Sequence, residues 1–400
     1  MLGYLFSEET EIVAVSDIDT NIAGKKLDGW GLRTTKIYND YKKMIDHEEL
    51  DIIEILTPHH LHAPMVIYAA KAGIPGISVQ KPMAHNITDC DNMIKACHEE
   101  NVKLKLFENF RFYPVYLKAK ELLTQGIIGD LFNFRINTLS TGGPSMHRDI
   151  KSLIWRANID TCGGGPLVYD DGIHKFSMAL WLMGEERVEK VFSWIDYFAT
   201  VMDQPSYILW QYPSEPDKPK YGTMEFTLAP NLYYPSNYYG CDEFIEISGT
   251  KGIMWINQCT SGGNIFSKKP QFSPIIVYTV GDVKVFGNDL PRDWRYSFIN
   301  STKHFIKVVK EGGEPIYTGE QGKALCIFAK LPYISNQNNR IAYWEEITTD
   351  GELDKSCIVE EPQNIDPRGF MLFNRNVRRD LKKGINQGLV NTDFKYQYET

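Results

Sequence analysis

Residues 51–82 read DIIEILTPHHLHAPMVIYAAKAGIPGISVQKP, and the order of strand and helix signals in this stretch sets the fold class. The apolar run 51–58 predicts a strand, and the pattern over 62–73 predicts a helix. A second apolar run, 75–82, predicts another strand. Two strands joined by a helix in this way are typical of a parallel sheet with a helical crossover.

The same alternation of strands and helices extends to both sides of this stretch. Further strands are predicted at 11–19 and 103–110, and further helices at 38–50 and 87–102. Beyond Pro114, long strands rich in aromatic residues are separated by turn signals, which favours a large, mostly antiparallel sheet. We therefore predict an α/β protein with an N-terminal parallel sheet and a C-terminal α/β domain built on an open, mostly antiparallel sheet.

These elements divide the chain into three predicted parts. Residues 1–113 form the parallel-sheet domain, residues 114–340 form the second α/β domain, and residues 341–400 are a polar C-terminal extension of unknown role. The segment 203–222 is rich in proline and is interpreted as a surface insertion of the second domain.

Composition excludes several classes of function. Lys and Arg number 43 against 51 Asp and Glu, which gives a formal charge of −8 without a basic stripe, so a nucleic-acid partner is not expected. No apolar run approaches the ~20 residues of a membrane helix, and the first residues lack the features of a signal peptide. The 7 cysteines form no CxxC pair and are interpreted as reduced thiols of a cytoplasmic protein.

An acidic residue follows the first predicted strand. Asp17 lies in the run Ser16-Asp17-Ile18-Asp19, where a doubly wound sheet would meet a dinucleotide. A carboxylate at this position accepts hydrogen bonds from ribose hydroxyls and repels a 2′-phosphate, which favours NAD over NADP. The alternative interpretation is a solvated turn.

Three histidines follow the strand at 51–58, in the run Thr57-Pro58-His59-His60-Leu61-His62. A metal site is one interpretation, but the run holds no Cys or carboxylate, and adjacent histidine side chains diverge. We instead predict that Thr57, Pro58, His59 and His62 line a cofactor crevice, and we expect no metal.

Gln80 and Lys81 end the next predicted strand on the same edge of the sheet, where ligands bind in parallel α/β folds, and both are predicted to contact the cofactor. A lysine at such a place can hold a substrate oxygen, or stabilise an alkoxide while hydride leaves. The alternative is a surface lysine before a turn proline.

A candidate acid–base pair lies in GGGPLVYDDGIH, residues 163–174. Asp170 and His174 are four residues apart, so in an α-helix both side chains would lie on one face. A carboxylate beside an imidazole is suited to general acid–base catalysis near neutral pH. In the alternative interpretation, Asp170 caps a helix and His174 packs in its first turn.

Taken together, the motifs resemble the glucose–fructose oxidoreductase/inositol dehydrogenase/MocA-like (Gfo/Idh/MocA) family over residues 3–335. The resemblance rests on AVSDID, TPHHLH, QKP, ENFRFYP, Trp155-Arg156 and the GGG…Asp-x-Gly-x-His segment, in this order. It implies a Rossmann domain followed by an α/β domain whose open sheet often mediates dimers or tetramers. A homodimer or homotetramer is therefore expected.

The resemblance also implies roles for individual residues. Lys81 corresponds to the family's active-site lysine, and Asp170 and His174 to its Asp/His pair, with His174 taking the hydroxyl proton. Trp155 and Arg156 would border the substrate pocket, as would the loops 140–160 and 230–240. Asn109 is a further candidate for the cofactor and Arg111 for the substrate. Asp171 is extra to the family's motif, and it either binds a substrate hydroxyl or faces water.

Two features depart from the family pattern. Gln80 replaces the usual Glu, which keeps hydrogen-bonding capacity but removes a charge. The sequence also lacks a Gly-x-Gly-x-x-Gly turn before the helix that ends near Leu5-Phe6. We expect that the complete protein has this strand and loop before Met1, and that the chain as given binds dinucleotides weakly.

The expected function is hydride transfer between NAD and a secondary hydroxyl of a sugar, cyclitol or sugar derivative. One alternative is an NAD-dependent lyase or glycosidase that uses transient oxidation and recycles the cofactor. The other is a non-catalytic binding protein that keeps the fold without the glycine loop.

Overall fold

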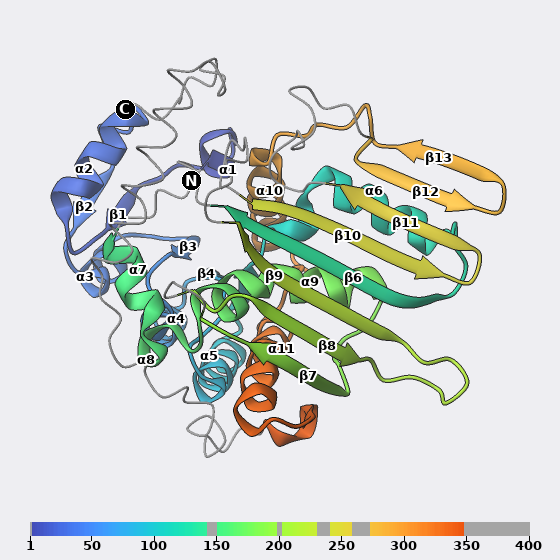
Figure 1. The fold of residues 1–400 in the computed structure, drawn as a ribbon. Helices are drawn as coiled ribbons and strands as arrows, with labels where there is room; N and C mark the ends of the chain where they lie inside the picture. Colours follow the sequence, from blue (N-terminus) through green and yellow to red (C-terminus); the bar gives the residue numbers. More distant parts are fainter. Residues whose placement is uncertain (1, 142–149, 198–201, 230–240, 258–272, 348–400) are drawn as a thin grey trace, which may run out of the picture.

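The computed structural model describes residues 2–141, 150–197, 202–229, 241–257 and 273–347 of the chain. Within them, short parallel strands and their helices occupy one side of the molecule, and a long open sheet occupies the other (Figure 1). The predicted α/β class is confirmed, with the parallel part first in the sequence.

The N-terminal strands are parallel to their neighbours. β1 (Ala14–Ser16) pairs with β2 (Lys36–Tyr38) in one sheet. β3 (Ile52–Ile55), β4 (Gly76–Gln80) and β5 (Lys103–Phe107) form a second sheet in that order. The middle strand β4 is buried at every position but its last, as expected for a parallel strand that is covered on both faces.

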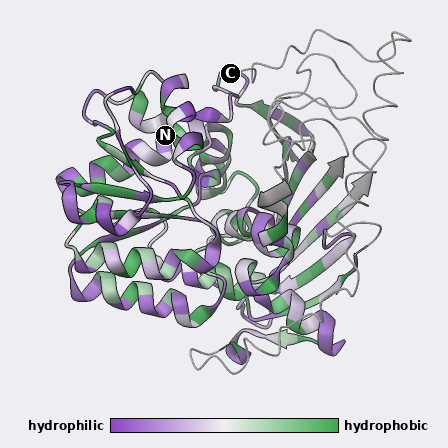
Figure 2. Ribbon diagram, turned by 90° about the vertical axis from the view of Figure 1, so that its left-hand side faces the viewer, coloured by the Kyte–Doolittle hydropathy of each residue, from purple (hydrophilic) through white to green (hydrophobic). Residues whose placement is uncertain are grey.

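Helices connect these strands, and three of them begin where a short polar side chain caps the first turn. Asp19, Asp40 and Asn86 each accept a hydrogen bond from a backbone N–H in the first turn of the helix that follows. The covering helices carry bands of both hydrophilic and hydrophobic residues, consistent with one face turned to the sheet (Figure 2). The helices of this part are α1 (Leu2–Leu5), α2 (Thr20–Gly29), α3 (Tyr41–His47), α4 (His62–Lys71) and α5 (Ile87–Glu99).

Among the described residues, the large sheet has nine strands in the order β13-β12-β11-β10-β6-β9-β8-β7-β14. Of the strand pairs in this described sheet only β6–β9 is parallel, so the prediction of a mostly antiparallel open sheet is confirmed. The strands are β6 (Leu131–Thr141), β7 (Lys190–Ile195), β8 (Ser206–Gln211), β9 (Tyr221–Ala229), β10 (Cys241–Gly249), β11 (Gly252–Asn257), β12 (Ile275–Thr279), β13 (Asp282–Phe286) and β14 (Ala342–Tyr343).

Two helices of the C-terminal half pack on the parallel part, and one of them, α11, also packs on the large sheet. α11 (Gly319–Asn338) packs on β7 of the large sheet and also on α5 and β5 of the parallel part. α10 (Arg295–Glu311) contacts α1 and β5. The other helices are α6 (Pro114–Thr124), α7 (Ile150–Ala157), α8 (Ile159–Cys162) and α9 (Gly172–Met183), and none of the described helices is long and apolar enough to cross a bilayer.

Two expectations from the sequence are wrong in this part of the chain. The proposed surface insertion 203–222 contains β8, whose sequence SYILWQ alternates between buried and exposed residues inside the sheet. Its prolines flank this strand and do not interrupt it, so the proline content was a misleading signal. The predicted C-terminal extension begins with β14, which pairs with β7 at the sheet edge, and its remainder, 348–400, lies outside the described residues.

Candidate active site

Lys81 connects the two halves of the molecule. It follows β4, and its Nζ lies 2.8 Å from the backbone oxygen of Asp170 and 2.9 Å from the Oδ1 atom of the same residue. The two residues are 89 positions apart in the sequence. The predicted active-site lysine and the predicted carboxylate are therefore in direct contact.

Asp170 is buried beneath a cluster of basic side chains. Arg156 Nε donates to Asp170 Oδ2 at 2.6 Å, and His59 Nε2 lies 3.4 Å from Asp170 Oδ1. Burial works to raise the pKa of Asp170, but Lys81, His59 and Arg156 outweigh it and hold that pKa well below its usual range. Asp170 is thus a carboxylate at any pH at which the protein would work, and it fixes the positions of the groups around it.

His59 and Trp155 form one wall beside this carboxylate. The His59 ring is held by Cys162, whose backbone oxygen lies 2.7 Å from Nδ1. The Trp155 ring meets the His59 ring edge-on at 4.7 Å, and the Arg156 guanidinium lies 4.1 Å from the Trp155 ring centroid. The predicted Trp155-Arg156 pair therefore borders the same region as Lys81.

His174 is oriented by a carboxylate that the sequence reasoning missed. Its Nδ1 donates to Glu108, which is fully buried, and its ring stacks on Phe110 at 4.1 Å between centroids. Glu108 Oε2 accepts a second bond from Ser177 Oγ at 2.9 Å, and Ser177 in turn contacts the Tyr317 hydroxyl. The carboxylate that contacts His174 is therefore Glu108 and not Asp170.

The difference has a local structural cause. Asp170 lies in a π-helical turn, Pro166–Asp171, whereas His174 lies in α9, which begins at Gly172. The rule that residues four apart share a face applies within an α-helix, not across this junction. The sequence does contain a feature that indicates a site role for Glu108. It lies at the end of a predicted parallel strand, as Lys81 does.

Strand pairing brings His174 and Lys81 into one region, because Lys81 follows β4 and Glu108, the partner of His174, follows the adjacent strand β5. Burial and the charge of Lys81 lower the pKa of His174, and Glu108 opposes this shift only in part. His174 is therefore a neutral imidazole at pH 7, with Nδ1 carrying the proton that Glu108 accepts. Nε2 is left as the basic nitrogen.

Asp171 belongs to a neighbouring buried network. Lys175 has no exposed side-chain surface, and its Nζ lies 2.7 Å from Asp171 Oδ2 while also pairing with Glu243. Burial works to raise the pKa of Asp171, but Lys175, His174 and Lys81 lower it below its usual range. Asp171 is thus charged beside the other candidates and retains some side-chain exposure.

The glycines before the π-helical turn are required by close packing. Gly163 has a φ of +94°, and a Cβ there would lie 2.4 Å from the backbone oxygen of His85. At Gly164 a Cβ would lie 2.4 Å from the Cβ of Tyr169. A side chain at Gly163 would push the turn away from the parallel domain, and one at Gly164 would clash with the turn itself, so either would displace Asp170.

Several predicted cofactor residues lie at the carboxyl ends of the parallel strands. Asp17 follows β1 and is exposed, and next to it Ile18 has 97% of its surface exposed, so a carboxylate and an apolar face are both open to a nucleoside. Thr57 and Pro58 follow β3 and are partly exposed. Gln80 Oε1 accepts a hydrogen bond from the backbone N–H of Lys81 at 2.9 Å. These residues fit a dinucleotide that runs along this edge.

Two predicted cofactor residues instead have structural positions. His62 is fully buried between the backbone oxygens of Thr57, at 2.8 Å, and Met83, at 3.0 Å, and burial lowers its pKa to about 4. Asn109 is also buried, and its Nδ2 donates to Ser297 Oγ at 2.7 Å. Both side chains are thus buried and hydrogen-bonded within the protein.

Arg111 packs between aromatic rings. Its guanidinium lies 4.5 Å from the Tyr317 ring centroid and 5.2 Å from that of Trp181. Residues 142–149 and 230–240, which belong to the two predicted pocket loops, lie outside the described residues. Within the described part of the chain, no group of three or more His, Cys, Asp or Glu side chains is arranged to hold a metal ion.

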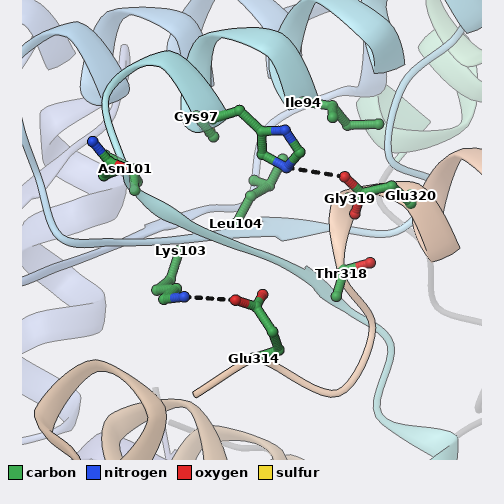
Figure 3. A pocket seen from close by; sticks show the side chains of 11 residues that line it. Ile94, Cys97, Asn101, Lys103, Leu104, Glu314, Thr318, Gly319 and Glu320 are labelled. Carbon is green, nitrogen blue, oxygen red and sulfur yellow. Dashed lines mark hydrogen bonds and ion pairs between the residues drawn. The ribbon is translucent and has the colours of Figure 1, made fainter. Parts of the chain in front are cut away.

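A separate pocket of about 420 Å³ opens between α5, the start of β5 and the start of α11 (Figure 3). Two ion pairs flank it, Lys103–Glu314 at 2.6 Å and His98–Glu320 at 3.1 Å. Lys103 begins β5, whereas Glu108 follows its other end. The pocket contains none of the predicted site residues, and we do not place the reaction there.

Comparisons with known proteins identify the family of the chain. Residues 4–108 match the model of the oxidoreductase family with an NAD-binding Rossmann fold, and residues 116–255 match the model of the Gfo/Idh/MocA C-terminal domain. Myo-inositol 2-dehydrogenase of Thermotoga maritima is 26% identical over 353 residues, which span 85% of this chain and 93% of that enzyme. Mouse trans-1,2-dihydrobenzene-1,2-diol dehydrogenase is 27% identical over 258 residues, 64% of this chain and 70% of that enzyme.

Solved structures show the same fold. An oxidoreductase from Agrobacterium radiobacter in complex with NAD⁺, L-tartaric acid and magnesium superposes with a TM-score of 0.70 at 19% sequence identity, over 87% of this chain and 95% of that one. Both domains of the chain are thus accounted for by one family. The protein belongs to the Gfo/Idh/MocA oxidoreductases, whose N-terminal domain is an NAD-binding Rossmann fold.

Proposed function

We propose that this protein is an NAD-dependent dehydrogenase that oxidises a secondary hydroxyl of a sugar, cyclitol or sugar derivative. The observation that carries the proposal is geometric: Lys81 follows β4 and contacts Asp170, and Glu108 follows the neighbouring strand β5 and contacts His174. A hydrogen-bond donor and a neutral base in the same region can act on the same hydroxyl oxygen.

The nicotinamide, when bound, supplies the acceptor for the hydride. His174 takes the hydroxyl proton on Nε2, because its Nδ1–H is already committed to Glu108. The buried negative charge of Glu108 stabilises the imidazolium that results. Lys81, held by Asp170, donates a hydrogen bond to the substrate oxygen and stabilises its developing negative charge.

The polar and aromatic groups around this region favour a polyhydroxyl substrate. Asp171 offers carboxylate oxygens to neighbouring hydroxyls, and Arg156 beside Trp155 offers N–H donors on an aromatic wall. The relatives named for myo-inositol and for a dihydrobenzenediol act on cyclic compounds that carry adjacent secondary hydroxyls. We infer that a vicinal diol of this kind is the substrate class.

The exposed face of the large sheet supports assembly into a homodimer or homotetramer. Phe192 lies opposite Leu209 and Trp194 opposite Tyr207 in the β7–β8 pair. Trp194, Tyr207 and Leu209 are each more than two-fifths exposed, so they form a continuous apolar surface. Light scattering should give the mass of two or four chains, and Trp194→Asp should lower it.

A polyol panel with NAD tests the proposed reaction. NADH should accumulate with one or a few cyclitols or sugars, and His174→Asn should abolish the accumulation. Product release without NADH would instead support the lyase or glycosidase alternative. If no polyol gives either signal, the dehydrogenase proposal fails and a binding protein becomes the better interpretation.

A further inference from the structure

A second buried carboxylate holds the opposite end of the turn that carries Asp170. Asp203 lies before β8 and has no exposed surface. Its Oδ1 accepts the backbone N–H of Leu167 at 2.7 Å, and its Oδ2 accepts that of Val168 at 2.8 Å. A carboxylate that accepts two successive backbone N–H groups fixes the direction of both peptide planes.

Tyr333 completes this arrangement from α11. Its hydroxyl donates to Asp203 Oδ2 at 2.6 Å and accepts the backbone N–H of Gly165 at 2.7 Å. A Cβ on Gly165 would lie 2.2 Å from Asp203 Oδ2, so the carboxylate is seated directly against the backbone. This close contact explains why the third residue of the GGG run is glycine, since any side chain there would clash with Asp203. We refer to Asp203 and Tyr333 as the turn clamp.

The clamped segment leads directly to the catalytic region. The backbone N–H of Asp170 donates to the oxygen of Gly165 at 3.1 Å, so the clamped residue and Asp170 are joined by the turn itself. The backbone oxygen of Asp170 accepts from Lys81 Nζ at 2.8 Å. A displacement of the 165–168 backbone would therefore move both oxygens that hold Lys81.

We propose that Asp203 and Tyr333 are positioning residues that hold Asp170, and through it Lys81, at the geometry the reaction needs. The proposal rests on the proposed dehydrogenase function. Neither clamp residue contacts the reacting atoms, so their effect should appear in the chemical step and not in cofactor binding.

Asp203→Asn and Tyr333→Phe test the clamp with little change in volume. An amide can accept only one of the two backbone N–H groups, because its NH₂ group is a donor. We expect kcat to fall on the order of 10-fold to 100-fold in Asp203→Asn, and less in Tyr333→Phe, with the Kd for NADH unchanged. Ser193→Ala is the matched control. Ser193 is also buried, and its Oγ donates to the backbone oxygen of Pro332 in α11 at 2.6 Å. Loss of this hydrogen bond should leave kcat unchanged.

A double-mutant cycle separates positioning from general stability. If Asp203 acts through Asp170, Asp203→Asn should have little further effect on kcat in an Asp170→Asn background. An undiminished effect in that background would overturn the proposal. If Asp203→Asn does not fold, the same cycle with Tyr333→Phe decides the question.

A readout without turnover keeps the clamp distinguishable from the proposed function. Reductive methylation of Lys81, followed by mass spectrometry, should proceed faster in Asp203→Asn than in the wild type and Ser193→Ala, because the ion pair with Asp170 is weakened. One outcome is that the wild type oxidises no polyol while Asp203→Asn still speeds the methylation of Lys81. In that case the proposed dehydrogenase reaction fails, and the positioning role of the turn clamp is supported. Unchanged methylation of Lys81 in both clamp variants would contradict the clamp itself.

Discussion

The imidazole of His174 donates a buried hydrogen bond to the carboxylate of Glu108 across 66 positions of sequence. Glu108 follows β5 of the parallel sheet, whereas His174 lies in α9 beside the large sheet. The His174–Glu108 contact therefore joins the two halves of the molecule, and the Lys81–Asp170 contact joins them beside it. Two carboxylates, each from a different half, orient one base and one ammonium group.

Glu108→Gln should lower kcat/KM on the order of 10-fold to 100-fold, because an amide oxygen can still accept from His174 Nδ1 but no longer stabilises the imidazolium. Steady-state kinetics with the best polyol of the panel measure the effect. Unchanged kcat/KM in Glu108→Gln would show that the Glu108 charge has no part in the reaction.

Lys81→Met should lower kcat about 100-fold or more, since the substrate oxygen loses its charged donor. The Kd for NADH should change little if the lysine acts mainly on the substrate. Lys103→Ala is the control, because it removes a lysine from another parallel strand, beside the separate pocket of Figure 3. This variant should leave kcat unchanged. Equal losses in the two variants would remove Lys81 from the catalytic role.

The pH dependence of oxidation should follow the neutral form of His174. Burial and Lys81 lower its pKa below 6.5, so kcat/KM should be constant near neutral pH and fall on the acid side, with a midpoint below 6.5. Because Glu108 raises the pKa of His174, Glu108→Gln should move this midpoint to still lower pH. A midpoint above 6.5, or a shift upward in Glu108→Gln, would contradict the assignment.

His62 should make the fold sensitive to acid. Its pKa is about 4 in the folded protein and about 6.5 when unfolded, so the unfolded chain binds more protons between these values and stability falls as pH decreases through them. The loss should reach on the order of 3 kcal/mol at full effect. Urea unfolding at several pH values measures it. His62→Gln should flatten this slope and His47→Gln, at an exposed position, should not; an equal slope in all three proteins would argue against the assignment.

Asp17→Ser should weaken discrimination against NADP. The carboxylate that would accept the ribose hydroxyls is removed, and with it the repulsion of a 2′-phosphate. The ratio of kcat/KM for NAD to that for NADP should fall on the order of 10-fold. An unchanged ratio would mean that Asp17 does not face the adenosine ribose.

The sequence was most informative where periodicity and strand ends carry the signal. The βαβ order located β3, β4 and β5, and the rule that ligands meet the carboxyl ends of parallel strands singled out Lys81. The same rule applied to Glu108 would have identified it. The antiparallel character of the second sheet also followed from its aromatic strands and turns.

Contacts between residues far apart in the sequence could not be predicted from periodicity or strand ends. Asp170 meets Lys81 and Asp203 meets Leu167 because of how the domains pack, and no local pattern records those distances. The π-helical turn invalidated the four-residue spacing of Asp170 and His174. The proline-rich composition of 203–222 likewise led to a wrong prediction of a surface insertion. Asp203 and alternate residues of β8 are in fact buried in the core.

NADH formation by the wild type, Lys81→Met and His174→Asn, at millimolar NAD and across a panel of sugars and cyclitols, tests the central claim most directly. The account predicts NADH with at least one vicinal diol in the wild type and nearly none in either variant, while all three proteins remain folded. Equal NADH formation in the wild type and both variants would contradict it, because the reaction would then depend on neither side chain.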